Sequence, residues 1–175
     1  LHLVDDILAL QSLDAGGMPF YMQTVDMRTL VAQAVEANAP YAQRYGVRVE
    51  LEAHATPRYV SADPDRVAQV LANLLSNAAK FSPADRPVRV TIGPLGEAVR
   101  VTVADDGPGI PAEARELVFA RFRQLDGTTT RSQDGSGLGL AISKAIVDRL
   151  GGVLDFESTV GKGTSFHFDL PATAG

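Results

Sequence analysis

The sequence predicts an α+β fold: a two-layer α/β sandwich in which a mixed, mostly antiparallel sheet carries helices on one face. Two observations predict this class. Stretches with an apolar residue at every second position, as in half-buried strands, are interleaved with stretches whose apolar residues recur at helical spacing. Two of the strand-like stretches follow one another across a short turn rich in Gly and Pro. This arrangement indicates an antiparallel hairpin, and with the helices it favours a sheet covered on one side.

The N-terminal segment stands apart from the rest of the chain. Its apolar residues recur at helical spacing in a stripe wide enough for a bundle or a coiled coil: Leu3, Val4, Ile7, Leu8 and Leu10. Gly16-Gly17 ends this helix. We therefore expect residues 1–17 to be a helix and linker, residues 18–172 to form the main domain, and residues 173–175 to be a tail. The opening on Leu1, with no initiator methionine, predicts a piece of a longer protein.

Two helices are predicted in the first half of the main domain. Asp26 is a good N-cap for a helix that runs to about Tyr45, where Gly46 ends it. A strand follows over residues 47–52. Asp63-Pro64 combines an N-cap with Pro at the first helical position, and this second helix ends before Ser82-Pro83.

The second half reads as a hairpin, a helix and two strands. Apolar residues alternate over residues 88–92 and 99–103, with Gly93–Gly96 as the predicted turn. The polar stretch 126–137 predicts a loop. A helix over residues 138–150 is closed by Gly151-Gly152, and strands are predicted over residues 153–157 and 164–170.

Composition excludes several classes of protein. The net charge is −5, and phosphate neutralisation along a nucleic acid needs clustered Lys and Arg, so we expect no nucleic-acid partner. No apolar run approaches the length of a membrane span, so we expect this domain to make no membrane contact. The absence of Cys removes disulfides and thiolate metal sites and fits a cytoplasmic location. Membrane attachment of a longer protein is left open.

Asn73, Asn77 and Lys80 form the first group of polar residues with chemical potential. They are spaced four and three apart, so one edge of the predicted helix presents all three. Neutral amide oxygens suit a hard cation that keeps several waters, and the Lys ammonium suits phosphate. A solvated polar face of the helix is the alternative interpretation.

Asp105-Asp106-Gly107-Pro108-Gly109-Ile110 directly follows a predicted strand. A carboxylate at a strand end can accept a hydrogen bond from an amino group such as that of adenine, and the glycines let the backbone approach the base. One alternative is a dinucleotide fingerprint, which Gly107, Gly109 and Ala112 match weakly; the preceding hairpin argues against the βαβ unit it needs. The second alternative interpretation of this motif is a plain Gly/Pro turn.

Two further Gly-rich segments come later in the chain. Gly135–Leu140 opens a helix, and backbone N–H groups at such a start form an anion site. The Gly-Lys-Ser/Thr ending of a P-loop is absent, so a phosphate site here is of another kind. Gly161–Phe166 is a turn into the last strand, for which a simple hairpin is the alternative.

In their order, these motifs resemble the nucleotide-binding domain of sensor histidine kinases. The wider superfamily contains DNA gyrase, heat-shock chaperone and mismatch-repair ATPases, and its fold is the Bergerat-type ATP-binding fold. The resemblance covers essentially the whole chain. Its motifs are the N box at Asn73–Ser82, the first Gly box at Asp105–Ile110, the F box at Phe119–Phe122, the second Gly box at Gly135–Leu140 and the closing turn at Gly161–Phe166.

The resemblance implies ATP and Mg²⁺ as cofactors and a role for each matched residue. Asn77 would ligate Mg²⁺ with support from Asn73, Lys80 would face phosphate, and Asp105 would read the adenine amino group. Residues 126–136 would be an ATP lid. The implied nucleotide-binding residues are Asn73, Asn77, Lys80, Phe81, Asp105, Gly107, Gly109, Ile110, Phe119, Phe122, Gly135, Ser136, Gly137, Leu138, Gly139, Leu140 and Thr164. The implied catalytic residues are Asn73, Asn77, Lys80, Arg123 and Gln124.

The sequence matches the family less well at the basic residue that would contact the γ-phosphate. Arg121, Arg123 and Arg131 are candidates for this contact. The family often has Arg two positions after the second Phe of the F box, and this sequence has Gln124 there, beside Arg123.

Asn73 favours phosphoryl transfer to histidine over hydrolysis. The superfamily's ATPases have a water-activating Glu one turn before the metal-binding Asn, and this sequence has an amide in that place. A neutral imidazole acceptor needs no strong base, so positioning and charge neutralisation suffice. The alternatives are a superfamily ATPase clamp and a degenerate module that regulates a partner.

The phosphoacceptor is not expected in this sequence. Its histidines are His2, His54 and His167, and none has the family's acceptor pattern. The resemblance implies that residues 1–17 are the end of the second helix of a dimerisation hairpin. The acceptor would lie upstream of Leu1, the full-length protein would be a homodimer, and a response regulator would receive the phosphate.

Overall fold

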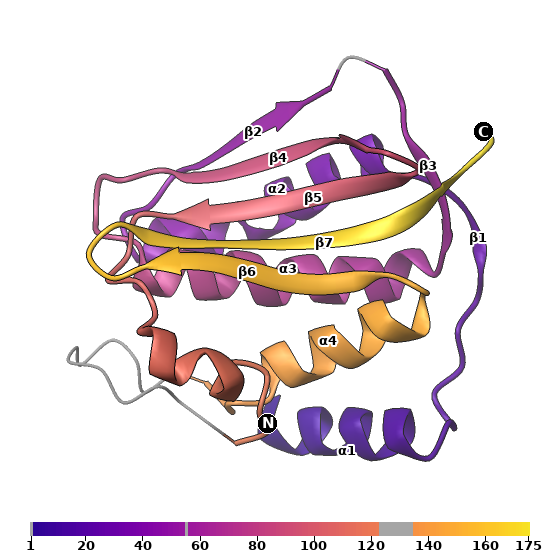
Figure 1. Cartoon of the computed structure of the whole chain (residues 1–175), viewed down its shortest axis with the longest axis horizontal. Coiled ribbons are helices and arrows are strands. Elements are labelled where there is room, and N and C mark those ends of the chain that lie inside the picture. Colours follow the sequence, from indigo (N-terminus) through magenta and orange to yellow (C-terminus); the bar gives the residue numbers. More distant parts are fainter. Residues whose placement is uncertain (1, 55, 123–134) are drawn as a thin grey trace.

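The computed structural model describes residues 2–54, 56–122 and 135–175 of the chain. Over these residues the order of elements is α1 (His2–Asp14), β1 (Gln23–Asp26), α2 (Met27–Arg44), β2 (Val49–Ala53), β3 (Tyr59–Ala62), α3 (Pro64–Phe81), β4 (Val88–Leu95), β5 (Ala98–Asp105), the 3-10 helix η1 (Ala112–Leu117), α4 (Gly139–Arg149), β6 (Val153–Thr159) and β7 (Gly163–Thr173). Figure 1 shows one sheet with helices packed beneath it. The predicted two-layer α+β class is confirmed.

The described strands form one sheet in the order β1-β3-β7-β5-β4-β2, and β6 also pairs with β7. The long strand β7 organises the sheet: it pairs with β5 and β6 over most of its length and with β3 at its last residues. Of the described pairs, only β2 with β4 is parallel. The prediction of a mixed, mostly antiparallel sheet is therefore confirmed.

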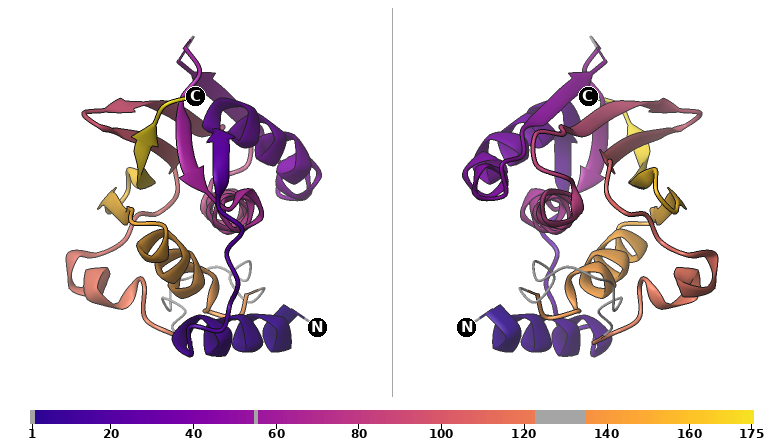
Figure 2. Two further views of the ribbon diagram at one scale, coloured as in Figure 1. Left: turned by 90° about the vertical axis from the view of Figure 1, so that its right-hand side faces the viewer. Right: turned by 90° about the vertical axis from the view of Figure 1, so that its left-hand side faces the viewer.

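Helices α2, α3 and α4 lie on the same face of this sheet (Figures 1 and 2). Alternation along the central strands turns every second side chain towards them, and these side chains are almost fully buried. The sheet contributes Val88, Val90, Ile92, Val99, Val101, Val103, Phe166, Phe168 and Leu170 to the core. Helix α3 contributes the facing stripe of Val67, Val70, Leu71, Leu74 and Leu75. This packing leaves the opposite edge of α3, with its polar residues, beside α4.

Both predicted helix starts are confirmed in detail. One carboxylate oxygen of Asp63 accepts hydrogen bonds from the backbone N–H groups of Asp65 and Arg66, at 2.9 and 3.3 Å. The other oxygen accepts from the Tyr21 N–H at 2.8 Å, which fixes the incoming linker to the start of α3. Asp26 caps α2 in the same manner, accepting from the Arg28 N–H at 3.1 Å.

Sequence periodicity misplaced one turn and missed two strands. The predicted turn Gly93–Gly96 is wrong, because β4 continues through Gly93 and Pro94 to Leu95. The chain reverses direction between Leu95 and Ala98. Pro94 is tolerated because β2 has already ended opposite Ile92, so no ladder hydrogen bond is lost on that side. Strands β1 and β3 have four residues each, too short for a clear alternating pattern.

Helix α1 lies on the far side of α4 from the sheet (Figures 1 and 2). Leu10 is buried against the domain, whereas Leu3, Val4 and Leu8 are about half exposed or more. Among the described helices, none is long and apolar enough to cross a bilayer.

Candidate nucleotide site

Asn73 fastens α3 to the start of α4. Its side-chain amide nitrogen donates to the Gly139 carbonyl and to the Ser143 hydroxyl, both at 3.1 Å. A Cβ added to Gly139 would lie 3.4 Å from the Asn73 amide carbon, in ordinary van der Waals contact, so the two helices lie close together here. Asn73 thus joins the N box directly to the second Gly box.

Asn77 and Lys80 continue the same edge of α3 and remain available. Within the described ranges, no group hydrogen-bonds to the Asn77 amide and no carboxylate pairs with Lys80. The Lys80 ammonium lies 3.1 Å from the point where Gly135 would carry a Cβ. The structure therefore places the predicted phosphate-facing Lys beside the first residue of the second Gly box.

Asp105 is a buried carboxylate at the end of β5. Its Oδ1 accepts a 2.8 Å hydrogen bond from the Gly107 N–H. Burial raises the pKa of the Asp105 carboxyl to about 6, against the opposing effect of backbone hydrogen bonds from Gly107 and Thr164. Thr164 is its register partner on β7, so these two predicted residues lie side by side.

Two glycines of the first Gly box are required by close backbone contacts. A Cβ on Gly107 would lie 2.7 Å from both the Phe81 carbonyl oxygen and Asp105 Oδ1. Gly109 has φ +77° and would carry its Cβ into the Thr159 carbonyl. The box is therefore held between the end of α3 and the β6–β7 turn, with the Gly161 N–H donating to the Pro108 carbonyl at 2.8 Å.

The second Gly box combines a buried anchor with an accessible start of α4. Leu138 is fully buried in the hydrophobic core, and Leu140 packs against that core. Gly137 takes φ +69°, and the Ser136 hydroxyl accepts from the Leu138 N–H at 3.2 Å. The two leucines hold α4 in place, while the glycines and Ser136 form its exposed end.

The two F-box phenylalanines occupy different environments. Phe119 packs edge-on against Phe156 and Phe166, with ring centroids 5.9 and 6.3 Å apart. Phe122 is 63% exposed and has a left-handed backbone, φ 58°, and its N–H donates to the Gly137 carbonyl at 3.1 Å. The F box is thereby attached both to the core and to the second Gly box.

The predicted basic contacts to the γ-phosphate are not assembled in the described residues. Arg121 pairs with Asp14 of α1 at 2.6 Å. The other candidates, Arg123, Gln124 and Arg131, and most of the predicted lid lie outside the described residues.

Ser158 and Ser143 belong to none of the predicted motifs, although both support the site. The Ser158 hydroxyl accepts from the Ile110 N–H at 2.7 Å and lies 2.8 Å from the Thr164 hydroxyl, which links the first Gly box to the closing turn. Ser143 is the buried partner of Asn73. No sequence signal marked them, because their roles arise from the β6–β7 register and from the packing of α3 on α4.

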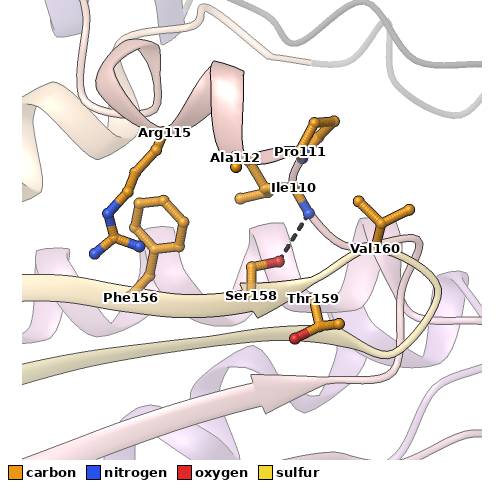
Figure 3. A pocket seen from close by; sticks show the side chains of 8 residues that line it. All are labelled: Ile110, Pro111, Ala112, Arg115, Phe156, Ser158, Thr159 and Val160. Atoms are coloured by element: carbon orange, nitrogen blue, oxygen red, sulfur yellow. Dashed lines mark hydrogen bonds between the residues drawn. The ribbon is translucent and has the colours of Figure 1, made fainter.

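A hollow of about 280 Å³ lies beside this site, between η1 and the β6–β7 turn. Figure 3 shows Ile110 and Ser158 joined by a hydrogen bond among its lining residues. The Arg115 guanidinium lies over the Phe156 ring, 4.6 Å from its centroid. The lining of the hollow includes no residue of α3, of α4 or of the second Gly box. Its position therefore does not match the space between the Asn73–Lys80 edge and α4 that the motifs define.

No carboxylate–histidine metal cluster occurs among the described residues. The amide donors on α3 are suited to Mg²⁺ that is held largely by phosphate oxygens and water, because this ion is bound reluctantly by protein groups alone. Asn77, with its unpaired amide, fits this requirement better than Asn73, whose amide is engaged by α4.

Comparisons with known proteins identify the family of this chain. Residues 62–174 match the family described as "Histidine kinase-, DNA gyrase B-, and HSP90-like ATPase". The chain is 38% identical over 174 residues to the circadian input-output histidine kinase CikA of Thermosynechococcus vestitus, covering 98% of this chain and 24% of that protein. It is 35% identical over 178 residues to the sensor histidine kinase WalK of Bacillus subtilis, covering 98% of this chain and 28% of WalK.

A solved structure extends the likeness to three dimensions. Full-length ShkA in complex with AMPPNP superimposes with a TM-score of 0.87 and 31% identity, over 99% of this chain and 36% of ShkA. The chain therefore belongs to the histidine kinase, gyrase B and HSP90-like ATPase family, as an ATP-binding catalytic domain of the histidine kinase type. It spans about a quarter of the length of the curated relatives cited above. The dinucleotide-binding alternative is wrong, because β5 pairs antiparallel with both β4 and β7.

Proposed function

We propose that this domain binds ATP with Mg²⁺ and donates the γ-phosphoryl group to a histidine on a dimerisation domain of the same protein. The observation that carries the proposal is the placement of the Asn73–Lys80 edge of α3 against the second Gly box, with Asp105 and the first Gly box beside the C-terminal end of the same helix. A nucleotide bound here would meet a base acceptor at Asp105 and cationic and amide groups along the edge that faces the second Gly box.

The base end is supported by a preformed set of contacts. The Gly107 N–H orients the Asp105 carboxylate, and in this proposal the carboxylate accepts from the adenine amino group. In this proposal Gly107 and Gly109 let the backbone approach the base. In this proposal Phe81, Ile110 and Thr164 line the same end of the site.

The phosphate end is supported by charge and by dipole. Lys80 brings an ammonium to Gly135, and the start of α4 presents backbone N–H groups and the positive end of its helix dipole. In this proposal Asn77 would hold Mg²⁺, and the ion would supply charge neutralisation at the phosphates. Asn73 positions Gly139 and orders that end of the site.

The hydrogen bonding of the Asn73 side chain favours phosphoryl transfer to histidine over hydrolysis. Its amide nitrogen donates two hydrogen bonds to α4, so this side chain is a structural tie and offers no base for a water molecule. A neutral imidazole already carries the lone pair that attacks phosphorus. In this proposal the domain positions the triphosphate and neutralises its charge.

The proposed acceptor and partners lie outside this chain. We propose that residues 1–17 are the end of the second helix of a dimerisation hairpin, in keeping with the exposed apolar Leu3, Val4 and Leu8 on α1. The full-length protein would be a homodimer located in the cytoplasm or facing it, and a response regulator would accept the phosphate. His54, whose Nδ1 accepts from the Thr56 N–H, lies at a strand end remote from the site motifs.

Calorimetric titration with AMPPNP, with and without Mg²⁺, tests the binding site. Asp105→Asn is expected to weaken binding about ten-fold or more under both conditions, because it removes the charged acceptor. Asn77→Ala is expected to weaken binding mainly when Mg²⁺ is present. Asp106→Asn is the matched control, since it removes a neighbouring carboxylate that pairs with Arg89 at 2.8 Å. Wild-type affinity in both Asp105→Asn and Asn77→Ala would overturn the site.

Incubation with radiolabelled ATP tests the reaction. The chain alone is expected to incorporate negligible acid-labile phosphate, and to label a separately supplied dimerisation domain of the full-length protein. Rapid steady hydrolysis without any acceptor would instead identify an ATPase clamp. Failure to bind AMPPNP would identify a degenerate regulatory module.

A further inference from the structure

Three neighbouring strands place Asp105, Thr164 and Ser158 in one row on the helix-covered face of the sheet. Thr164 on β7 is the register partner of Asp105 on β5 and of Ser158 on β6. Asp105 and Thr164 are each 7% exposed. The backbone of Gly163 lies so close to Asp105 that a Cβ there would meet the Asp105 carbonyl. Thr164 therefore lies between the buried carboxylate and the Ser158 hydroxyl.

The hydrogen bonds of Ser158 decide where its one hydroxyl proton goes. The backbone N–H of Ile110 can only donate, and it donates to Ser158 Oγ at 2.7 Å (Figure 3). The Gly163 carbonyl can only accept, and Ser158 Oγ donates to it at 3.0 Å. A hydroxyl has one proton and two lone pairs, so the Ser158 oxygen keeps one lone pair and no proton. The 2.8 Å contact between the two hydroxyls is therefore a hydrogen bond that Thr164 donates.

This direction fixes the chemistry that Thr164 offers to a ligand. Its only hydroxyl proton is committed to Ser158, so the Thr164 oxygen can present acceptor lone pairs alone. Asp105 beside it is ionised above its pKa of about 6, and the carboxylate is then an acceptor as well. Above that pH, these two side chains accept hydrogen bonds from a ligand and donate none.

We propose that Ser158 sets the selectivity of the site for a 6-amino purine over a 6-keto purine, by holding the Thr164 hydroxyl as an acceptor. The inference rests on the proposed function, because it requires the base to lie against Asp105 and Thr164. An amino group carries two N–H donors, which match two acceptors. A keto oxygen in its place would face two acceptors with no proton between them. Ser158 acts on the base only through Thr164 and is therefore a positioning residue.

Calorimetric titrations with ADP and with inosine diphosphate (IDP) at pH 8 test the inference, because IDP carries a keto oxygen in place of the 6-amino group. We expect the wild-type chain to bind ADP at least about ten-fold more tightly than IDP. Ser158→Ala frees the Thr164 proton to point towards the keto oxygen, so the preference for ADP is expected to fall about five-fold. Ser158→Thr retains the hydroxyl and is expected to retain the preference.

Two controls separate this role from a general effect on the fold. Ser165→Ala removes the next hydroxyl along β7, which lies on the opposite face of the sheet, and is expected to leave the preference unchanged. Thr164→Val is expected to lower the preference by itself. Ser158→Ala is expected to change nothing further when it is added to Thr164→Val, because Ser158 acts through Thr164. Circular dichroism checks that each variant is folded, and Thr164→Val carries the test if Ser158→Ala does not fold.

An unchanged preference for ADP in Ser158→Ala or in Thr164→Val would overturn the inference, as would a wild-type chain that binds ADP and IDP equally. An equal loss in Ser158→Thr or in Ser165→Ala would also overturn it, because the loss would then follow from any substitution in the β6–β7 hairpin. If the wild-type chain binds neither nucleotide, the proposed function fails as well. If it binds ADP with a preference that Ser158→Ala does not alter, only the inference fails.

Discussion

The Asn73 side chain donates a 3.1 Å hydrogen bond to the Ser143 hydroxyl, which is fully buried between α3 and α4. This contact, together with that to the Gly139 carbonyl, makes Asn73 part of the scaffold that positions the second Gly box. Asn77, one turn later on the same edge, makes no such contact with any described residue. Two amides with the same chemistry therefore have separable roles.

Asn73→Ala is expected to lower the free energy of unfolding by about 1–2 kcal/mol without nucleotide, because Ser143 loses its buried partner. Asn77→Ala serves as the control and is expected to change stability by less than about 0.5 kcal/mol. Urea denaturation followed by circular dichroism measures both. Equal stability losses in the two variants would contradict the separation of roles.

Gly107→Ala is expected to destabilise the domain by about 2–4 kcal/mol, since its Cβ would be forced against the Phe81 carbonyl and the Asp105 carboxylate. Gly93→Ala is the matched control. Gly93 lies in β4 with open space where its Cβ would be, so we expect a change within about 0.5 kcal/mol. Thermal melts of the two variants test this, and a Gly107→Ala protein as stable as Gly93→Ala would contradict the close packing of the first Gly box.

Asp105 is expected to make the stability of the nucleotide-free domain fall as pH rises. Burial raises its folded-state pKa to about 6, above the value of 3.8 for a free Asp. The neutral carboxyl is therefore favoured by folding: its contribution is complete below about pH 4 and is lost as pH rises through 6. The loss approaches about 3 kcal/mol by pH 8, as an upper limit. Asp105→Asn is expected to remove this part of the pH dependence in urea melts at pH 5 and pH 8.

Asp106 provides a control of opposite sign. The hydrogen bond from Arg89 holds the pKa of the Asp106 carboxyl below its usual range, so its contribution is present at neutral pH and is lost on acidification. Asp106→Asn is therefore expected to weaken the domain slightly at pH 8 and not at all at low pH. A pH profile unchanged by Asp105→Asn would contradict the buried-carboxyl interpretation.

Phe119→Ala is expected to cost about 2–4 kcal/mol of stability, because the ring packs against Phe156 and Phe166. Phe122→Ala is expected to change stability by less than about 0.5 kcal/mol, since this side chain is largely exposed. Chemical denaturation distinguishes them. A comparable loss in both variants would contradict the separate environments of the two rings.

The sequence by itself determined the class of fold, the family and the main helix boundaries. Asp63-Pro64 and Asp26 carry their capping chemistry locally, so the starts of α3 and α2 follow from a few adjacent residues. The alternation in β4, β5 and β7 likewise reports a local property, the burial of one face. The Gly and Asn motifs predicted the family and a nucleotide site because their ordered occurrence, rather than any one of them, is specific.

Only the tertiary structure decided what each matched residue does. It separated Asn73 from Asn77 and Phe119 from Phe122, and it placed Arg121 on Asp14. It also showed the hydrogen bonds of Ser143 and Ser158, two residues that belong to no motif. The physical reason is that hydrogen bonding and burial depend on segments distant in the sequence, such as α3 against α4 and β6 against β7. Spacing along one element fixes which side chains share an edge, but the neighbouring element decides which of them remain free to bind a ligand.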